Sequence, residues 1–181
     1  FMNGTDFPAI ARVIEAETGI PAFSVPTNGM NDYVYGAGIA LEQIARRFVK
    51  EPVRQEKGGD SSRAVNLLGV TPLDFGSQEN VETLKENLKK NGWKVLSTWA
   101  MGDDLEILQK SGETSVNLVV SSVGLRAAKI LWEKYQIPYV IGTPNEWLAE
   151  DISNELETVI IQHSGIEQQS TIADQADPAI V

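Results

Sequence analysis

From residue 64 to residue 162, short apolar runs alternate with longer segments in which apolar residues recur every three or four positions. The apolar runs, which we expect to be buried strands, are 64–70, 94–100, 115–121 and 137–142. The periodic segments, which we expect to be helices, begin after Ser77, near Leu105, at Gly124 and at Asn145. This alternation predicts an α/β fold, namely a doubly wound four-stranded parallel sheet with helices on both faces.

A shorter pattern precedes this alternation. Residues 7–18 show the periodicity of an amphipathic helix that Gly19 ends, and residues 33–49 show that of a second helix. Between them, "PAFSV" (21–25) is typical of a short strand. Two helices and one strand are too few for a domain, so residues 1–49 are expected to be the C-terminal part of a preceding α/β domain.

Polar stretches divide the rest of the chain. The stretch "KEPVRQEKGGDSSR" (50–63) is charged and contains glycines, which is typical of a linker. Residues 64–165 are then expected to form one complete α/β domain. The last stretch, 166–181, has little periodicity and is expected to be a tail or a linker to a missing third domain.

Composition narrows the class of function. The chain has 181 residues, a net charge of −10 and a pI near 4.6, which argue against nucleic acid or an anionic membrane as a partner. It has no cysteine and one histidine, His163, so neither a disulfide framework nor a thiolate metal site is expected. No signal peptide and no apolar run of about 18 residues are visible, which favours a soluble, cytoplasmic protein.

Candidate chemistry lies where the predicted strands end. Ligands of doubly wound sheets bind at the carboxyl ends of the strands, where helix starts also offer backbone N–H groups. Hydroxyl and turn residues follow the predicted strands, and the turn-rich loop 26–32 adds one more candidate. The candidate ligand-binding residues are Ser121, Ser122, Gly124, Asn28, Thr71 and Thr143.

A structural role is the alternative for two of these residues. Ser121 and Ser122 could simply cap the helix that begins near Gly124. No P-loop pattern is present, and the single histidine is far in sequence from these loops, which leaves a catalytic triad without a base. We therefore assign no metal ligand and no catalytic residue.

The chain resembles the nitrogenase component 1 family of oxidoreductases in four stretches, which are "GTDFPAIARVIEAETGIPAFSVPTNGMNDYVYGAGIALE", "GVTPLDF", "NGWKVLSTWAMG" and "NLVVSSVGLRAAKILWEKYQIPYVIGTP". Family subunits are built from three α/β domains. The resemblance implies that residues 1–49 end the first domain and that 64–165 form the second, a chelatase/nitrogenase-like middle domain with the strand order 2-1-3-4.

Two positions depart from the family pattern. Ser121 stands where the molybdenum–iron subunits have the cysteine that holds the iron–molybdenum cofactor, and Ile39 stands where they have a histidine near the substrate. A neutral hydroxyl is a poor ligand for an iron–sulfur cluster. The resemblance therefore implies a substrate other than dinitrogen. It implies no cofactor in this stretch, and an iron–sulfur cluster or a tetrapyrrole in the full-length protein.

The resemblance favours one function and leaves two others open. The favoured function is that of part of a nitrogenase-like oxidoreductase subunit, inactive alone, which accepts electrons from an ATP-dependent iron–sulfur reductase and reduces a substrate other than dinitrogen. The second is a non-catalytic binding or assembly module for a metal cluster or a tetrapyrrole. The third is a lobe of a periplasmic metal-complex binding protein, against which the lack of an export signal counts.

Protein partners follow from the same resemblance. They are a partner subunit of the same family, in a homo- or hetero-oligomer, and the iron–sulfur ATPase reductase, with no nucleic acid and no membrane. Exposed apolar side chains would mark the surface that faces such partners. The candidates are Met30, Tyr33, Tyr35, Trp99 and Met101.

Overall fold

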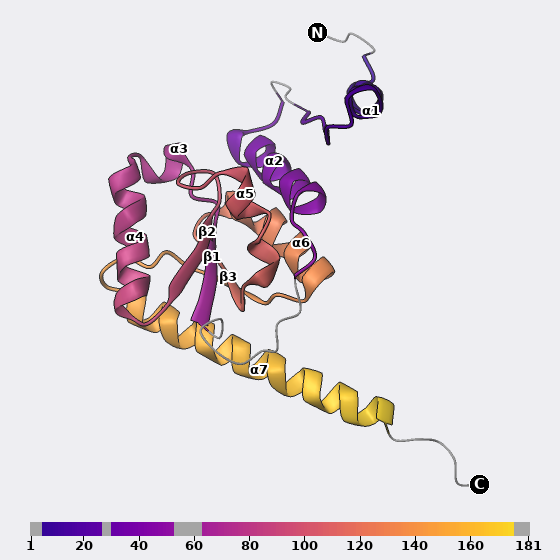
Figure 1. The fold of residues 1–181 in the computed structure, drawn as a ribbon. Helices are drawn as coiled ribbons and strands as arrows, with labels where there is room; N and C mark the ends of the chain where they lie inside the picture. Colours follow the sequence, from indigo (N-terminus) through magenta and orange to yellow (C-terminus); the bar gives the residue numbers. More distant parts are fainter. Residues whose placement is uncertain (1–4, 27–29, 53–62, 176–181) are drawn as a thin grey trace, which may run out of the picture.

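The computed structural model describes residues 5–26, 30–52 and 63–175, with side-chain positions as far as residue 164. The helices are α1 (Phe7–Thr18), α2 (Tyr33–Arg47), α3 (Pro72–Phe75), α4 (Gln78–Lys90), α5 (Leu105–Leu108), α6 (Leu125–Tyr135) and α7 (Ala149–Gln175), with the short 3-10 helices η2 (Ser111–Glu113) and η3 (Ser122–Gly124). The strands are β1 (Ala64–Leu68), β2 (Lys94–Thr98), β3 (Val116–Val119) and β4 (Tyr139–Ile141) (Figure 1).

The four strands form one parallel sheet in the order β2-β1-β3-β4, which confirms the predicted fold and strand order. β1 and β3 lie in the middle, and every residue of both strands is buried. A parallel strand covered on both faces needs apolar side chains on both faces, which is why these strands read as nearly continuous apolar runs. Leu118 pairs with Leu67 in β1 and with Val140 in β4, so the register is regular from the centre to the β4 edge.

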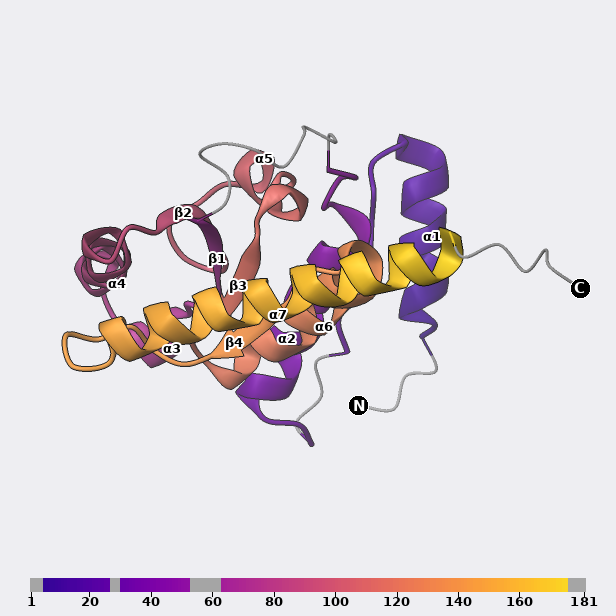
Figure 2. The same cartoon turned by 90° about the horizontal axis from the view of Figure 1, so that it is seen from below.

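Helices cover the two faces of this sheet as separate layers (Figures 1 and 2). α4 and α7 pack on one face, and their apolar side chains form a first core cluster with those of the strands. α2, α5 and α6 pack on the other face around a second core cluster. Large, fully buried members are Leu67, Leu88, Leu118 and Leu156 in the first cluster and Leu68, Trp99 and Leu131 in the second. The sheet is thus the middle of three layers.

The largest difference from the predicted elements concerns α7. The sequence predicts a helix over 145–162 and a tail from residue 166, whereas α7 begins at Ala149 and continues to Gln175. The later start has a local cause, because the Asn145 side chain accepts hydrogen bonds from the backbone of the following turn. Although α7 is long, neither it nor any other helix in the described ranges is both long and apolar enough to cross a membrane.

The stretch predicted as a strand at 21–25 has no regular secondary structure, so this prediction is wrong. A strand needs a neighbouring strand for its backbone hydrogen bonds. The four strands of the described sheet pair with one another and not with this stretch. Its Ala22 N–H is instead bonded to the Glu15 carboxylate of α1, at 3.4 Å.

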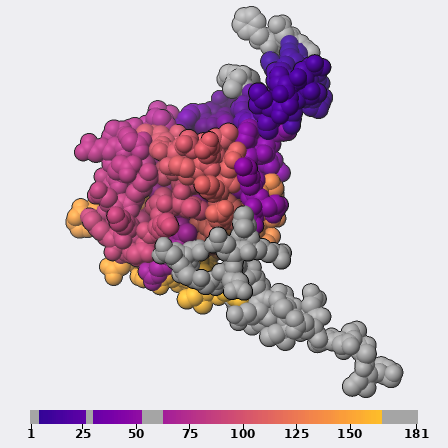
Figure 3. Space-filling model, in the orientation of Figure 1, coloured from indigo at the N-terminus to yellow at the C-terminus, as the bar shows by residue number. Residues whose placement is uncertain are grey.

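α1 and α2 lie differently with respect to the sheet. α2 packs on α6 and contributes Leu41 and Ala45 to the second core cluster. α1 protrudes from the body of the molecule, as Figure 3 shows, and Ala11 is its one buried residue. The domain boundaries expected at 49 and 63 stay predictions, although α2 packs as part of the layer that covers the sheet.

A group of buried polar side chains joins the three strands β2, β1 and β3. Asn66 donates hydrogen bonds to Asn117 Oδ1 at 2.8 Å and to the Ser111 carbonyl at 2.9 Å. Ser97 donates to Asn66 Oδ1 at 2.7 Å. The indole N–H of Trp99 lies 3.0 Å from the hydroxyls of both Ser97 and Ser111. All five residues are fully buried, so any polar atom that loses its partner here has no water to replace it.

Three of the five apolar side chains predicted to face a partner are exposed. The exposed fractions are 91% for Met30, 39% for Tyr33 and 37% for Tyr35. The prediction is wrong for Trp99, which is fully buried, and for Met101, which packs against the first core cluster. The indole N–H of Trp99 can be buried because it donates to the hydroxyls of Ser97 and Ser111 in the polar group described above. Ser111 comes from η2.

We predict that Asn66→Ala lowers the free energy of unfolding by about 2–4 kcal/mol, because Asn117 Oδ1 and the Ser111 carbonyl lose their donor in a buried place and the Ser97 hydroxyl loses an acceptor. Urea denaturation of the full chain measures this loss. The matched control is Asn154→Ala on the exposed surface of α7, which should change stability by less than about 0.5 kcal/mol. Equal effects of the two substitutions would contradict the prediction.

Candidate functional site

The loops that follow the strands meet at one edge of the sheet, as expected for parallel strands. Backbone and side-chain hydrogen bonds join neighbouring loops there. The Val70 N–H donates to the Trp99 carbonyl at 2.9 Å, which links the loops after β1 and β2. The Ser121 hydroxyl donates to the Gly69 carbonyl at 2.8 Å, which links the loops after β3 and β1. The loops after β1, β2 and β3 are therefore held together by hydrogen bonds of the protein itself.

Ser121 lies where the loop after β3 enters η3, and its hydroxyl caps no helix. Its partner Gly69 has a φ of 90°, and a Cβ added there would lie 2.6 Å from the Gly124 nitrogen and 2.9 Å from Ser121 Oγ. A Cβ added at Gly124 would lie 2.4 Å from the Leu68 carbonyl oxygen. The two glycines thus allow the loop after β1 and η3 to touch backbone to backbone, and Ser121 fastens this contact.

The remaining candidate residues divide into bonded and exposed ones. Thr71 is buried and donates to Asp74 Oδ2 at 2.9 Å. Thr143 donates to a backbone carbonyl just after β3 at 3.0 Å. Ser122 is exposed and, like Ser121, caps no helix, so the capping role considered for both serines is wrong. Asn28 lies outside the described residues.

Acidic side chains after β2 serve as hydrogen-bond acceptors for the same loops. Asp103 accepts from the Thr98 N–H, and Asp104 accepts from the Ile107 N–H at 3.0 Å and so caps α5. Both carboxylates therefore have a structural use. Their negative charge at this edge does not favour a phosphate ligand.

The Glu82 carboxylate on α4 accepts hydrogen bonds from two side chains of the same helix. Gln78 donates to its carboxylate at 3.0 Å and Lys85 at 3.2 Å. These hydrogen bonds, first that from Gln78 and then that from Lys85, lower the pKa of Glu82. Lys85 is thereby committed to Glu82, although its ammonium approaches Gly102 in the loop after β2.

A groove of about 530 Å³ lies between α1 and α2. Its walls are mostly apolar, with Phe7 and Ala11 from α1, Phe23 from the stretch after α1, and Ile39 from α2. The groove is open to solvent on one side. The groove is therefore a second candidate site.

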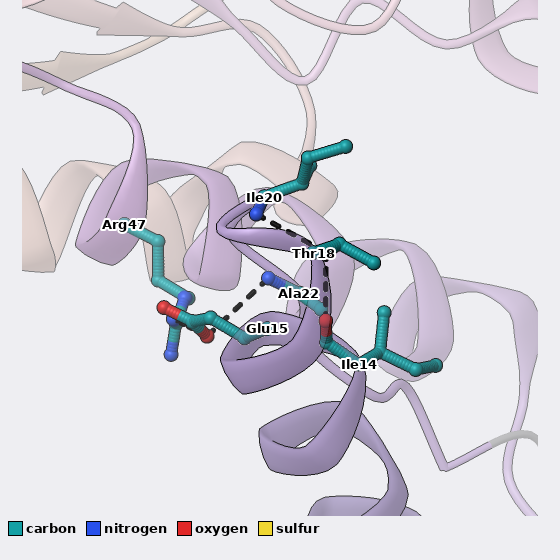
Figure 4. A network of polar contacts seen from close by, with 6 residues as sticks. All are labelled: Ile14, Glu15, Thr18, Ile20, Ala22 and Arg47. Carbon is teal, nitrogen blue, oxygen red and sulfur yellow. Dashed lines mark hydrogen bonds and ion pairs between the residues drawn. The ribbon is translucent and has the colours of Figure 1, made fainter.

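Figure 4 shows how α1 is held against α2 beside this groove. Glu15 of α1 forms an ion pair with Arg47 at the end of α2. The same carboxylate accepts a hydrogen bond from the Ala22 N–H, so the stretch after α1 is fixed as well. The Thr18 hydroxyl accepts from the Ile20 N–H at 3.2 Å and tightens the turn between them.

Sequence reasoning missed this groove because its residues come from three segments that no pattern connects. The strand predicted at 21–25 also places Phe23 in a sheet and not in a groove wall. One signal was available in the sequence, namely the apolar face predicted for the helix at 7–18. The structure leaves that face largely uncovered. Phe7 and Val13 on that helix are each 60% exposed, which is unusual for an amphipathic helix that packs on a core.

No group of three or more His, Cys, Asp or Glu side chains is placed to hold a metal ion within the part of the chain that the structure describes. The single histidine has a packing role. The His163 ring on α7 lies edge-on to the Trp132 ring of α6, with centroids 5.2 Å apart. These observations define an α/β protein with a closely bonded carboxyl edge and a separate apolar groove.

Comparison with known protein families identifies the family of this α/β protein. Residues 2–173 match the family model described as "Nitrogenase component 1 type Oxidoreductase". The chain belongs to this family, as the resemblance implied.

Several similar curated proteins are subunits B of the light-independent protochlorophyllide reductase. The subunit from Anthoceros angustus is 34% identical over 108 residues, which are 58% of this chain and 21% of that protein. The subunit from Crocosphaera subtropica is 28% identical over 123 residues, which are 64% of this chain and 24% of that protein. The chain thus spans about a fifth to a quarter of the length of these relatives.

A solved structure titled "Nitrogenase Cp1 at pH 5" superposes with a TM-score of 0.64. The superposition covers 94% of this chain and 35% of that chain, at 20% sequence identity. At this identity the likeness establishes the shared fold.

We predict that Gly124→Ala destabilises the protein by about 1–3 kcal/mol, because the new Cβ would overlap the Leu68 carbonyl. The control is Gly36→Ala in α2, where a Cβ meets nothing within 4 Å. Alanine is the better helix former, so this control should gain about 0.5–1 kcal/mol. Thermal and urea unfolding measure both effects, and a neutral Gly124→Ala would show that the backbone contact is not as close as described.

Ser121→Ala should cost about 1 kcal/mol of stability, because the Gly69 carbonyl loses its hydrogen bond at a half-buried place. Ser122→Ala, at the neighbouring exposed hydroxyl, serves as the control and should be neutral within about 0.5 kcal/mol. The urea midpoints of the two variants are compared with that of the wild type. If the two variants unfold alike, the Ser121 hydroxyl does not fasten the loops.

Proposed function

We propose that this chain is part of a nitrogenase-like reductase subunit whose substrate is not dinitrogen. Its family and its similarity to light-independent protochlorophyllide reductase subunits support this proposal. In the full-length protein, electrons would come from an ATP-dependent iron–sulfur reductase. A tetrapyrrole is the substrate class that the relatives' names favour.

The observation that carries the proposal is that position 121 holds a serine whose hydroxyl is bonded to the backbone. The family resemblance puts the cofactor-holding cysteine of molybdenum–iron subunits here. In this chain the Ser121 hydroxyl donates to the Gly69 carbonyl. Iron–sulfur clusters are held by thiolates, and a neutral hydroxyl that is already committed to a backbone carbonyl does not replace one. Ser121 therefore does not fit a cluster ligand, and no step of the proposed reaction uses a cluster at this position.

A second subunit of the same family and the reductase are the proposed partners. Exposed apolar side chains support a protein-facing surface, since contiguous apolar patches are typical of interfaces. They include Met30, Tyr33 and Tyr35 around the start of α2 and Phe7 and Val13 on α1.

A non-catalytic binding or assembly module is the second candidate function. The groove between α1 and α2 favours it, because mostly apolar walls suit an apolar organic ligand better than a charged metal cluster. In that case the protein would hold a tetrapyrrole without reducing it.

The proposed function predicts that the full-length protein, combined with its partner subunit and the reductase, reduces protochlorophyllide and forms no ammonia from dinitrogen. The measurement follows the absorption spectrum of the pigment under anaerobic conditions, and the control omits ATP. ATP-dependent ammonia formation would refute the proposal. Pigment binding without any ATP-dependent spectral change would favour the binding module instead.

A further inference from the structure

One side of α2 is buried against the domain that carries the sheet, residues 64–165. Leu41, Ala45 and Val49 recur at every fourth position, so they lie on one side of the helix and of the turn that follows it. All three are buried, and they share the second core cluster with Ala127 and Leu131 of α6. Burial of apolar surface drives the association of two elements as it drives folding. α2 is thus part of a core and not a helix that merely lies on a surface.

The closest approach of α2 to the sheet domain is at Gly38, which is buried. A Cβ added there would lie 3.2 Å from Cδ of Arg126 in α6 and 3.5 Å from the Val123 carbonyl oxygen in η3. Since η3 belongs to the carboxyl edge of the sheet, α2 supports the turn at this edge as well as α6.

Hydrogen bonds hold the C-terminal end of α2 in the same place. The last carbonyls of a helix have no partner within the helix. Here Lys134 of α6 donates to the Arg46 carbonyl at 2.9 Å, and the Tyr135 hydroxyl donates to the Val49 carbonyl at 2.7 Å. The Lys50 N–H donates to the Gln109 carbonyl at 2.9 Å. The end of α2 is therefore satisfied by groups of the sheet domain.

Charged and aromatic side chains fix the orientation of α2 on α6. A guanidinium nitrogen of Arg126 lies 3.3 Å from the Glu42 carboxylate, and the guanidinium lies 5.2 Å from the centre of the Tyr35 ring. The Glu42 side chain is only 18% exposed, so water screens this ion pair less than a fully exposed one.

α1 is attached to α2 more weakly. Ala11 is the one buried residue of α1. The ion pair between Glu15 and Arg47 joins two side chains that are each about one third exposed, and pairs at such positions contribute little to stability. α2 is therefore better attached to the sheet domain than to the helix that precedes it.

We infer that α2, as far as Lys50, is an integral helix of the sheet domain and stays bound to it without the covalent link after residue 52. The domain then begins just before Tyr33, and not at residue 64 as the sequence pattern predicts. The family resemblance assigns α2 to the end of the first domain. The surface of α6 and η3 that α2 covers is then where the first domain is held against the sheet. This inference does not depend on the proposed function.

The test cuts the folded chain at one of two places. A protease recognition sequence with Gly–Ser spacers is inserted after Gly58, within the predicted linker, or after Gly29, between α1 and α2. Each protein is purified intact, cleaved and passed over a size-exclusion column. A fluorophore at the N-terminus reports the dissociation constant of the N-terminal piece through its anisotropy on dilution.

We expect residues 1–58 to stay bound after the cut at Gly58, and residues 1–29 to separate after the cut at Gly29. Tyr135→Phe removes the hydrogen bond to the Val49 carbonyl and keeps the ring, so it should weaken binding of the piece 1–58 about three- to tenfold. Tyr33→Phe, at an exposed tyrosine of α2, is the control and should bind within about twofold of the wild type. Unfolding curves of the uncut proteins confirm that each variant is folded.

Three results would overturn the inference. Release of residues 1–58 by the cut at Gly58 would mean that α2 is held by the covalent link alone. Retention of residues 1–29 after the cut at Gly29 would place α1 in the same domain and reject the boundary before Tyr33. Equal dissociation constants for Tyr135→Phe and the wild type would mean that the bound piece is not docked on α6 as described.

Discussion

The contact between Gly69 and Gly124 is the constraint on which the other parts of the structure depend. It brings the backbone after β1 against η3 at distances that no Cβ would allow. α6 begins at the next residue, Leu125, so the contact sets where this helix starts on the sheet. α2 packs on α6 and on η3 in turn. The positions of α6 and α2 on the sheet therefore depend on two residues that have no Cβ.

This contact also bears on the polar groups of the carboxyl edge. When loops approach so closely, their carbonyls are removed from water and need donors from the protein. Ser121 and Thr143 supply such donors, and Thr71 is bonded to Asp74. Three of the hydroxyls that the sequence suggests for a ligand, those of Ser121, Thr143 and Thr71, thus stabilise the edge itself.

The central strands β1 and β3 could be predicted from the sequence, because strands that are buried on both faces are nearly continuous apolar runs. The candidate site could be predicted only in part. Ser121 was correctly placed at the strand end, but its bond to Gly69 joins residues 52 positions apart, which no local pattern reveals. For the same reason the burial of Trp99, next to Ser111, was missed. The order of the strands in the sheet was predicted from the family resemblance and not from the apolar pattern.

The polar group around Asn66 has a consequence for how the chain folds. Asn66 of β1 is bonded to Asn117 of β3 and to Ser97 of β2, so its side-chain partners come from two other strands, up to 51 residues away in sequence. A sheet with only two of these strands would bury the Asn66 amide without one of its partners, which costs free energy. Partly assembled sheets are thereby disfavoured relative to both the complete sheet and the open chain. Contacts of such long sequence separation form slowly, so we expect this sheet to fold slowly. We also expect it to form cooperatively, with β2 and β3 joining β1 in a single step.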